Sequence, residues 1–292
     1  MIFIKIGFIG AGKVGCTLGK FLKEGGYSIS GYYSRTATSA KEAADFTESD
    51  TFKTISQLIR ESDAVFITVP DGKIKSVYNQ VSQHNIEGKI ICHASGSLTV
   101  AECFPDIESK GAYGYSIHPL FPVSTKFKTY KELGGAFFCV EGSKKYLKNI
   151  TDILENLGCN ARIIQGNDKV KYHAACAISS NLMCALVGES IDLLIECGFP
   201  QDMALKALTP LIISNLQHIT EDGPVKALTG PVERGDTETV RKHLTCFNKE
   251  EEREMYRYLT LKLIDIAKEK HMDRDYSSME NLINETPTTY KL

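Results

Sequence analysis

The chain has 292 residues, of which 42% are hydrophobic and 24% are charged, and its formal net charge is −2. These values are ordinary for a globular protein of about two domains, and so small a net charge gives no reason to expect nucleic acid or an acidic membrane surface as a partner. The longest apolar runs have the length of strands, so we expect no transmembrane helix. The N-terminus shows no cleavage-site pattern, which predicts a cytoplasmic protein without a signal peptide.

The nine cysteines are scattered along the chain and form no C-x-x-C pair. Most of them stand among apolar residues, as Cys176 and Cys184 do. This usage predicts small buried thiols in a reducing compartment, without disulfides and without a bound metal.

The N-terminal residues carry the most specific motif. Ile2–Ile9 predicts a buried strand, and apolar residues 14, 18, 21 and 22 predict one face of a following helix. Between them lies a G-x-G-x-x-G turn made of Gly10, Ala11, Gly12, Lys13, Val14 and Gly15. A strand, this turn and a helix in that order are typical of a dinucleotide-binding βαβ unit. The alternative is a tight strand–helix turn without a ligand.

Each glycine of the turn has a physical reason in such a unit. Gly10 makes the tight turn, Gly12 lets the backbone approach the pyrophosphate, and Gly15 lets the helix pack closely on the strand. The helix N-terminus then offers free N–H groups and a positive dipole end to the phosphates.

The end of the second predicted strand, Tyr27–Tyr33, indicates which dinucleotide binds. The strand runs into Ser34, Arg35 and Thr36, and no acidic residue occurs between Glu24 and Glu42. A cofactor without the 2′-phosphate usually requires a carboxylate here for its ribose hydroxyls, whereas Arg35 can pair with a 2′-phosphate. The sequence therefore favours NADP(H) over NAD(H), the alternative being that Arg35 is a solvated loop charge.

Strand and helix patterns alternate through the first half of the chain. Further strands are predicted at residues 64–69, 89–93, 112–117, 135–140 and 161–164, with a helix around 143–157. Such alternation predicts an α/β fold with a doubly wound parallel sheet, whose ligands lie beyond the carboxyl ends of the strands. We therefore expect one crevice lined by the strand ends, namely Val69, Pro70, Asp71, Ser95, Gly96, Ser97, His118 and Pro119.

The pattern becomes helical after residue 165. One long helical stretch is predicted over Asp168–Cys197, a second over Gln201–His218 with a kink or break at Pro210, and a last one over Glu250–His271. Asp236 is expected to cap a short helix over 237–244, and the polar tail past Asp273 is expected to be partly mobile. We predict a Rossmann domain over residues 1–165 and an all-helical domain for substrate binding and dimerisation over 166–292.

Several motifs together resemble the Rossmann-like proteins that carry a DUF2520 domain, within the 6-phosphogluconate dehydrogenase C-terminal-like superfamily. Wider relatives include pyrroline-5-carboxylate reductase, prephenate dehydrogenase and ketopantoate reductase. The motifs are the glycine turn, His93–Ser97, Ser116–Leu120, Lys169–Ala175 and Thr229–Asp236, in the expected order along nearly the whole chain. The resemblance implies the architecture of an NADP-dependent oxidoreductase, a homodimer, and no particular substrate.

The candidate catalytic residues are Lys169, His173 and His118. Lys169 and His173 are four residues apart, so they share one face of a helix, and Asn181 lies eight residues further on the same stripe. The resemblance implies a lysine followed four residues later by an asparagine against the nicotinamide, and this chain has His173 in place of that asparagine. Lys169 could stabilise charge and His173 could exchange a proton. The alternative is that both are structural.

Other polar residues complete the predicted site. His118 resembles the histidine of the His-Pro pair of prephenate dehydrogenases, which meets substrate, although it could equally form a turn. Ser95 could contact the cofactor, while Ser97, Asn181 and Arg234 are expected to bind an anionic substrate, Arg234 from a partner subunit or else as a surface ion pair. His93 is expected to be a structural histidine.

The sequence as a whole predicts an NADP(H)-dependent oxidoreductase that transfers a hydride to or from a small, anionic carbonyl, imine or alcohol. The partners expected are this small-molecule substrate and a second copy of the chain. Two alternatives remain open: a non-catalytic NADP(H) sensor or scaffold with the same fold, and an enzyme that uses a deazaflavin as hydride partner.

Overall fold

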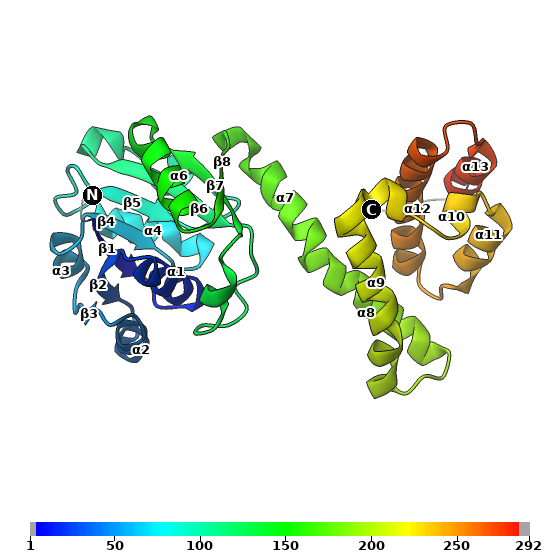
Figure 1. Cartoon of the computed structure of the whole chain (residues 1–292), viewed down its shortest axis with the longest axis horizontal. Helices are drawn as coiled ribbons and strands as arrows, with labels where there is room; N and C mark the ends of the chain where they lie inside the picture. Colours follow the sequence, from blue (N-terminus) through cyan, green and yellow to red (C-terminus); the bar gives the residue numbers. More distant parts are fainter. Residues whose placement is uncertain (1–3, 286–292) are drawn as a thin grey trace. The chain divides into compact units, whose positions relative to one another are not determined.

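The computed structural model describes residues 4–285, in two compact units, Met1–Leu182 and Met183–Leu292 (Figure 1). The first unit is a sheet covered by helices, and the second is helical, as the sequence predicts. The structure divides the chain at residue 182, because the first helix after the last strand groups with the sheet. The sequence predicted the division at residue 165, where the pattern of strands ends. Ile2 and Phe3 of the predicted first strand lie outside the described residues.

The first unit contains one eight-stranded sheet in the order β3-β2-β1-β4-β5-β6-β7-β8. Its strands are β1 (Lys5–Ile9), β2 (Ser28–Tyr33), β3 (Asp50–Thr51), β4 (Ala64–Ile67), β5 (Ile90–His93), β6 (Tyr113–Pro119), β7 (Phe137–Gly142) and β8 (Asn160–Ile163). Strand order reverses between β1 and β4, which is where doubly wound sheets bind their ligands.

Helices cover both faces of this sheet. They are α1 (Lys13–Glu24), α2 (Ala37–Thr47), α3 (Ile55–Arg60), α4 (Asp71–Val81), α5 (Val100–Cys103) and α6 (Leu147–Asn156). The helix α7 (Lys169–Ser179) follows β8 and buries Lys169 at its start. Side chains of α1, α2 and α6 pack with Phe66, and side chains of α3, α4 and α5 pack with Val65 and Ile67. Phe66 thus belongs to a different hydrophobic core from Val65 and Ile67, because successive side chains of a strand point to opposite faces of the sheet.

The last two strands, β7 and β8, run opposite to the other six, which departs from the parallel sheet that the sequence predicts. β7 pairs antiparallel with β6, and all other pairings are parallel. The connection between β6 and β7 contains only one short 3₁₀ turn, Thr129–Glu132, and no crossover helix. A parallel strand usually follows a crossover helix, whereas an antiparallel strand needs none, so a connection without a helix fits the antiparallel direction.

The second unit is built from α8 (Asn181–Glu196), α9 (Gln201–Ala227), α10 (Pro231–Arg234), α11 (Thr237–Cys246), α12 (Glu250–Lys270) and α13 (Ser277–Glu285). Val240, Ile264, Met279 and other buried residues of α10–α13 form its core. Asp236 caps α11 as predicted, because its carboxylate accepts a hydrogen bond of 3.0 Å from the Thr239 N–H.

Two predicted helices differ from the structure. The stretch predicted over Asp168–Cys197 is interrupted at Ser180, whose φ of −124° and ψ of −77° are not helical. Ser179 donates its hydroxyl back to the Ala175 carbonyl, a contact that often bends helices. In α9 the dihedrals remain helical at Pro210, and the break falls instead at Gly223, where φ is 81° and Pro224 follows. A positive φ suits glycine, so Gly223 absorbs the change of direction.

The tail also differs from the prediction. The chain forms α13 after Asp273, and Met279 and Ile283 of this helix are fully buried. These two apolar residues, four positions apart, anchor the helix to the core of the second unit. The part of the predicted mobile tail beyond residue 285 lies outside the described residues.

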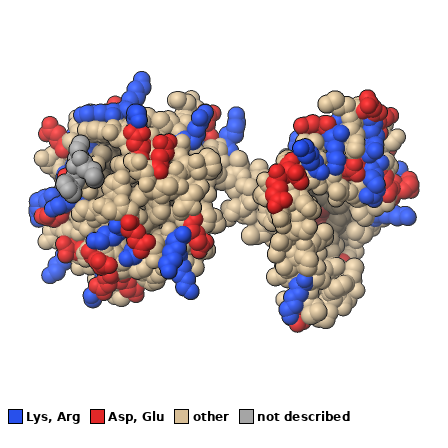
Figure 2. All heavy atoms as spheres, in the orientation of Figure 1, with Lys and Arg blue, Asp and Glu red and all other residues tan. Residues whose placement is uncertain are grey.

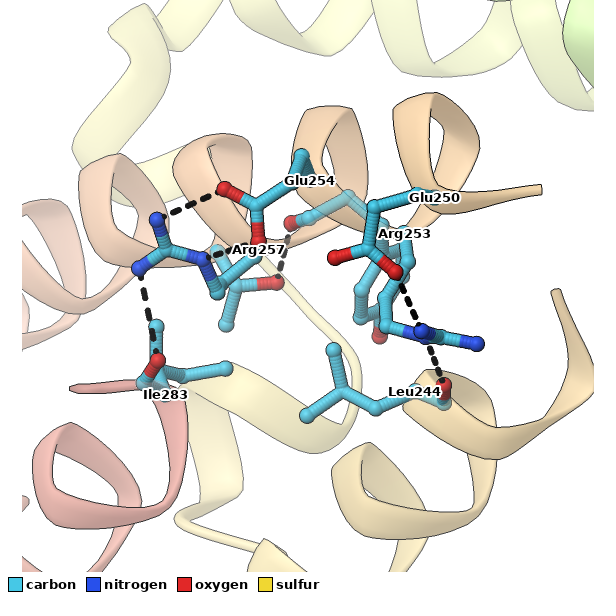
Figure 3. A network of polar contacts seen from close by, with 8 residues as sticks. Leu244, Glu250, Arg253, Glu254, Arg257 and Ile283 are labelled. Atoms are coloured by element: carbon cyan, nitrogen blue, oxygen red, sulfur yellow. Dashed lines mark hydrogen bonds and ion pairs between the residues drawn. The ribbon is translucent and has the colours of Figure 1, made fainter. Parts of the chain in front are cut away.

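Hydrogen bonds from two arginines of α12 tie this helix to its neighbours (Figure 3). Both side chains of the Arg257–Glu254 pair are less than a tenth exposed, and the guanidinium also donates to the Ile283 carbonyl in α13. One turn earlier, Arg253 pairs with Glu250 and donates to the Leu244 carbonyl of α11. The arginine forks thus satisfy helix carbonyls that would otherwise lack partners.

The helices α8 and α9 leave apolar side chains uncovered. Leu211 and Ile213 of α9 are 68% and 60% exposed, and α8 buries none of its residues. In Figure 2 few charged side chains lie over these two helices on the face shown. The stretch Gly166–Glu196 is also long and apolar enough to cross a membrane by length and composition alone, which the sequence reading had not anticipated.

The cysteines are only partly buried, which corrects the expectation of buried thiols throughout. Five are buried, Cys176 is intermediate, and Cys184, Cys197 and Cys246 are exposed. The exposed cysteines lie on or directly after the helices of the second unit, where less of the surface is covered than in the sheet. All nine are free.

Candidate functional site

The glycine turn has the geometry that the motif predicts. Gly10 has a φ of +112°, and a Cβ there would lie 2.6 Å from the Thr68 carbonyl oxygen. A Cβ on Gly15 would lie 2.4 Å from the Gly10 carbonyl oxygen. A Cβ on Gly12, in contrast, would meet nothing within 4 Å. Packing within the protein therefore explains two of the glycines, whereas the third faces open space.

The first turn of α1 is free to receive an anion. Gly12 is the N-cap residue and supplies no side-chain cap, and the first turn contains no acidic residue. Lys13 and Gly12 are exposed, while Ala11 is buried and Val14 is partly buried. The N–H groups and the positive dipole end of α1 thus face the open space beside Gly12.

The loop between β2 and α2 carries uncommitted hydrogen-bond donors. Arg35 and Thr36 are exposed and Ser34 is half-buried. Over residues 4–285, none of these three side chains makes a hydrogen bond or an ion pair, and Thr36 does not use its hydroxyl to cap α2. A guanidinium and two hydroxyls are therefore available at the end of β2.

The strand ends that the sequence assigns to one crevice lie together. Ser95 donates its hydroxyl to Asp71 over 2.7 Å and accepts the N–H groups of Ser97 and Leu98. Its hydroxyl is thus occupied in holding the loop after β5 against the first turn of α4. Val69 and Pro70, at the end of β4, directly precede α4.

Lys169 is the buried charge of the site. The side chain is 1% exposed, and Nζ donates to the Ser95 carbonyl over 3.0 Å and to the Ser116 hydroxyl. Burial lowers the pKa of Lys169, and the carboxylate of Glu141 opposes that shift. The buried ammonium group of Lys169 thus fastens the first residue of α7 to the loop after β5 and to the middle of β6.

His118 and His93 are both held in the neutral form. Burial, followed by the positive charge of Lys169, lowers the pKa of His118 to about 4 and that of His93 to about 3. His93 accepts the Ser95 N–H at Nδ1 over 3.2 Å and packs its ring edge-on against Phe104, which fits the predicted structural role. Its Nε2 is buried without a partner among the described residues.

His173 lies beside His118 rather than beside the Nζ of Lys169. The two imidazole rings are 5.9 Å apart and nearly perpendicular, and the Nδ1 of His173 is buried without a hydrogen-bond partner among the described residues. Lys169 and His173 share a helix as predicted, but the lysine points into the protein and the histidine into a cleft.

That cleft has a volume of about 330 Å³. His118 and His173 line it, together with Asn181 at the start of α8 and apolar residues that follow β6. Ser97 is half-buried in the loop after β5. Arg234 belongs to the second unit, where it is exposed at the last position of α10, and its side chain makes no hydrogen bond or ion pair with other described residues.

Tyr172 and Ser116, to which the sequence assigned no role, complete the site together with Gly96, which the sequence placed only among the residues of the crevice. Tyr172 bonds His118, Ser116 accepts from Lys169, and Gly96 lies directly beneath the two imidazoles. All three stand inside motifs quoted above, so the motif positions were the available signal. Within residues 4–285, no group of three or more histidine, cysteine or acidic side chains is placed to hold a metal ion.

Comparison with known proteins agrees with this architecture. Residues 2–119 match the Rossmann-like domain, and residues 136–263 match the domain of unknown function DUF2520. The chain therefore combines a Rossmann-like domain with a DUF2520 domain, which confirms the resemblance inferred from the motifs. No curated protein sequence matches the chain.

Solved structures share the fold over nearly the whole chain. Protein TM1727 from Thermotoga maritima is 26% identical with a TM-score of 0.72, over 91% of this chain and 99% of that one. A reductive aminase from Aspergillus terreus, in complex with NADPH and ethyl-5-oxohexanoate, is 15% identical with a TM-score of 0.64, over 97% and 99% of the two chains. Pyrroline carboxylate reductase from Plasmodium falciparum, with NADP bound, is 16% identical with a TM-score of 0.56, over 96% and 99%.

The depressed pKa of His118 predicts a pH-dependent stability. Between the unfolded value near 6.5 and the folded value of about 4, the unfolded chain binds a proton at this residue that the folded chain does not. The contribution of His118 is thus fully present above pH 6.5 and is lost as the pH falls toward 4. We expect His118→Gln to remove on the order of 2 kcal/mol of the fall in unfolding free energy across this window.

Urea unfolding at a series of pH values measures this difference. The matched control is His84→Gln, at an exposed position of the same unit, which should follow the wild-type curve. Parallel curves for wild type and His118→Gln would show that His118 titrates normally in the folded protein.

Proposed function

We propose that the chain is an NADP(H)-dependent oxidoreductase that transfers a hydride to or from a small, anionic carbonyl, imine or alcohol. The observation that carries the proposal is the open space at Gly12, at the N-terminus of α1 and at the reversal point of the strand order. Protein packing does not require a glycine there, whereas a pyrophosphate does. Structural relatives that contain NADPH or NADP support the same class.

The proposed cofactor contacts follow the strand ends. The pyrophosphate would lie on the turn from Gly10 to Gly15, and the 2′-phosphate would meet the free donors at Ser34, Arg35 and Thr36. Val69, Pro70 and the backbone of Ser95 would flank the rest of the dinucleotide. All these groups border the carboxyl ends of β1, β2, β4 and β5.

Arg35→Ala should weaken NADPH binding at least several-fold and leave NADH binding little changed. The reason is that one charge-assisted contact with the 2′-phosphate is lost, which is worth roughly 1.5–3 kcal/mol. Calorimetric titration of both cofactors into wild type and variant measures this. Equal affinity of the wild type for NADPH and NADH would refute the assignment of NADP(H).

The catalytic roles are proposed for Lys169, His173 and His118. When bound, the cofactor supplies or accepts a hydride at its nicotinamide ring. Lys169 would stabilise negative charge through the loop that it holds, His173 would exchange a proton with the substrate, and His118 would hydrogen-bond to it. Ser97, Asn181 and Arg234 would bind the anionic part of the substrate, with Arg234 supplied by a second copy.

Lys169→Ala and His173→Ala should each lower kcat by about 10²–10⁴-fold while changing NADPH affinity little, because general acid–base groups contribute that much. Steady-state kinetics after a screen of small keto acids, imines and hydroxyacids measures kcat. His173→Asn separates proton transfer from hydrogen bonding, since an asparagine can orient a substrate but cannot supply a proton at neutral pH. Alanine variants with wild-type kcat would contradict the catalytic assignment.

A non-catalytic NADP(H) sensor is the second candidate. The observation that favours it is the engagement of Lys169 by Ser95 and Ser116, which leaves its ammonium group facing protein atoms. If the protein is such a sensor, it should bind NADP(H) but should not turn over any compound in the screen.

The apolar surfaces of α8 and α9 support a homodimer. We propose that a second copy covers them, because uncovered leucine and isoleucine side chains of this number are costly in water. A break at Ser180 and the polar residues of α7, such as Lys171, fit a protein partner better than a lipid bilayer. We retain the cytoplasm as the proposed compartment.

Light scattering should give a mass near twice the chain mass of 32.3 kDa at micromolar concentration. Leu211→Glu, at an exposed site of α9, should shift the protein toward the monomer, because the charge would have to be desolvated at the interface. Met272→Glu is the control at an exposed position outside α8 and α9. A single-chain mass for the wild type would contradict the dimer.

A further inference from the structure

Two imidazole nitrogens converge on one point above Gly96. A Cβ on Gly96 would lie 2.5 Å from the Nδ1 of His173 and 2.9 Å from the Nε2 of His118. The sum of these distances, 5.4 Å, is the upper limit on the separation of the two nitrogens. One oxygen atom with two ordinary hydrogen bonds spans such a gap. The absence of a side chain at Gly96 is what keeps this space available.

Tyr172 fixes the hydrogen-bonding role of His118. Its hydroxyl lies 2.7 Å from the Nδ1 of His118, and the thiols of Cys139 and Cys176 are its other neighbours. An imidazole nitrogen is a much stronger acceptor than a thiol sulfur, so the phenol O–H donates to Nδ1. Burial raises the pKa of Tyr172, which keeps that proton in place. Neutral His118 must then carry its own proton on Nε2, on the side of Gly96.

The opposite side of the gap is open. The Nδ1 of His173 is buried and has no partner among the described residues, although buried polar atoms are nearly always paired. His173 also lines the cleft, so a ligand can reach the gap from there. The gap thus lies between the Nε2–H of His118, which can donate a hydrogen bond, and the Nδ1 of His173, which has no hydrogen-bond partner among the described residues.

These contacts discriminate between substrate classes. A carbonyl oxygen has two lone pairs and can accept from both imidazoles, and the hydroxyl formed from it can accept from His118 and donate to His173. A protonated imine nitrogen carries an N–H donor and has no lone pair. It cannot accept a hydrogen bond from the Nε2–H of His118, so two donors would face each other. It would also add a positive charge close to the buried Lys169, where like charges repel strongly.

We propose that His118 and His173, with Tyr172 as the positioning residue, form a cradle above Gly96 for the oxygen of a neutral carbonyl or of the corresponding alcohol, and that this cradle excludes iminium substrates. The inference rests on the proposed oxidoreductase function and narrows its substrate class. In the direction of reduction, the hydride adds to the carbonyl carbon and the π electron pair moves to oxygen. His173 gives its Nδ1 proton to that oxygen while its Nε2 takes a proton from water, so the new O–H bond forms with no net change in the charge of His173 and hydroxide leaves to solvent.

The tautomer of His118 tests the cradle without cofactor or turnover. Nuclear magnetic resonance of ¹⁵N-histidine-labelled protein, assigned with His118→Gln and His173→Gln, reports which ring nitrogen is protonated. We expect His118 to carry its proton on Nε2 in the wild type and to populate both tautomers in Tyr172→Phe. Tyr78→Phe is the control, since it removes a hydroxyl that only bonds the Pro105 carbonyl. A proton on Nδ1 of His118 in the wild type, or no change in Tyr172→Phe, overturns the positioning role.

Ligand titration tests the substrate class with the same resonances. The probes are 2-oxopentanoate and 1-pyrroline-2-carboxylate in its protonated form, two carboxylates of similar size that differ in the oxygen or the N–H offered to the cradle. We expect the oxo acid to shift the His118 and His173 signals and to bind at least about fivefold more tightly than the iminium. Equal or tighter binding of the iminium, or no shift with either probe, overturns the cradle.

Gly96→Ala should abolish the shifts caused by the oxo acid, because its methyl group would fill the gap, and Gly134→Ala is the control, at which a Cβ meets nothing within 4 Å. Oxo acid binding retained by Gly96→Ala overturns the placement. Calorimetry with NADPH distinguishes failure of the cradle from failure of the proposed oxidoreductase function. If the protein shows the expected tautomer and binds the oxo acid but does not bind NADPH, the cradle is supported and the oxidoreductase function is refuted.

Discussion

The arrangement of the site depends on the buried ammonium group of Lys169. A charge removed from water is costly unless it is fully hydrogen-bonded, and here the Ser95 carbonyl and the Ser116 hydroxyl provide that compensation. Because Lys169 is the first residue of α7, its bonds fix the start of this helix at the loop after β5 and at the middle of β6. Tyr172 and His173 follow three and four residues later, on the same face, and are thereby delivered to His118.

The same charge sets the chemistry of its surroundings. Together with burial, it keeps His118 and His93 neutral, so that they act as hydrogen-bonding groups and not as cations. The Nδ1 of a neutral His118 can accept a hydrogen bond from the Tyr172 hydroxyl, whereas the Nδ1 of a protonated imidazole could not. The bonds of Lys169 and the orientation of the two imidazoles are therefore parts of one arrangement.

The sequence predicted the parts of the molecule that local pattern controls. The strands, the glycine turn and the cap at Asp236 follow from apolar periodicity, backbone freedom and short-range hydrogen bonding. The crevice followed from a rule of topology, since parallel strands end at one edge of the sheet. The pattern did not reveal the antiparallel direction of β7, because direction depends on how a connection crosses space. Tyr172 also escaped prediction, because its role depends on a residue 54 positions away.

The proposed binding of NADP(H) depends on the open space beside Gly12. Its most direct test is calorimetric titration of NADPH into wild-type protein and Gly12→Val, with thermal unfolding of both. A Cβ at Gly12 meets no protein atom within 4 Å, so the variant should fold with little change in stability. We predict that the wild type binds NADPH and that the folded variant does not, because the valine fills the place of the pyrophosphate. Undiminished NADPH binding by folded Gly12→Val, or no binding by the wild type, would contradict the account.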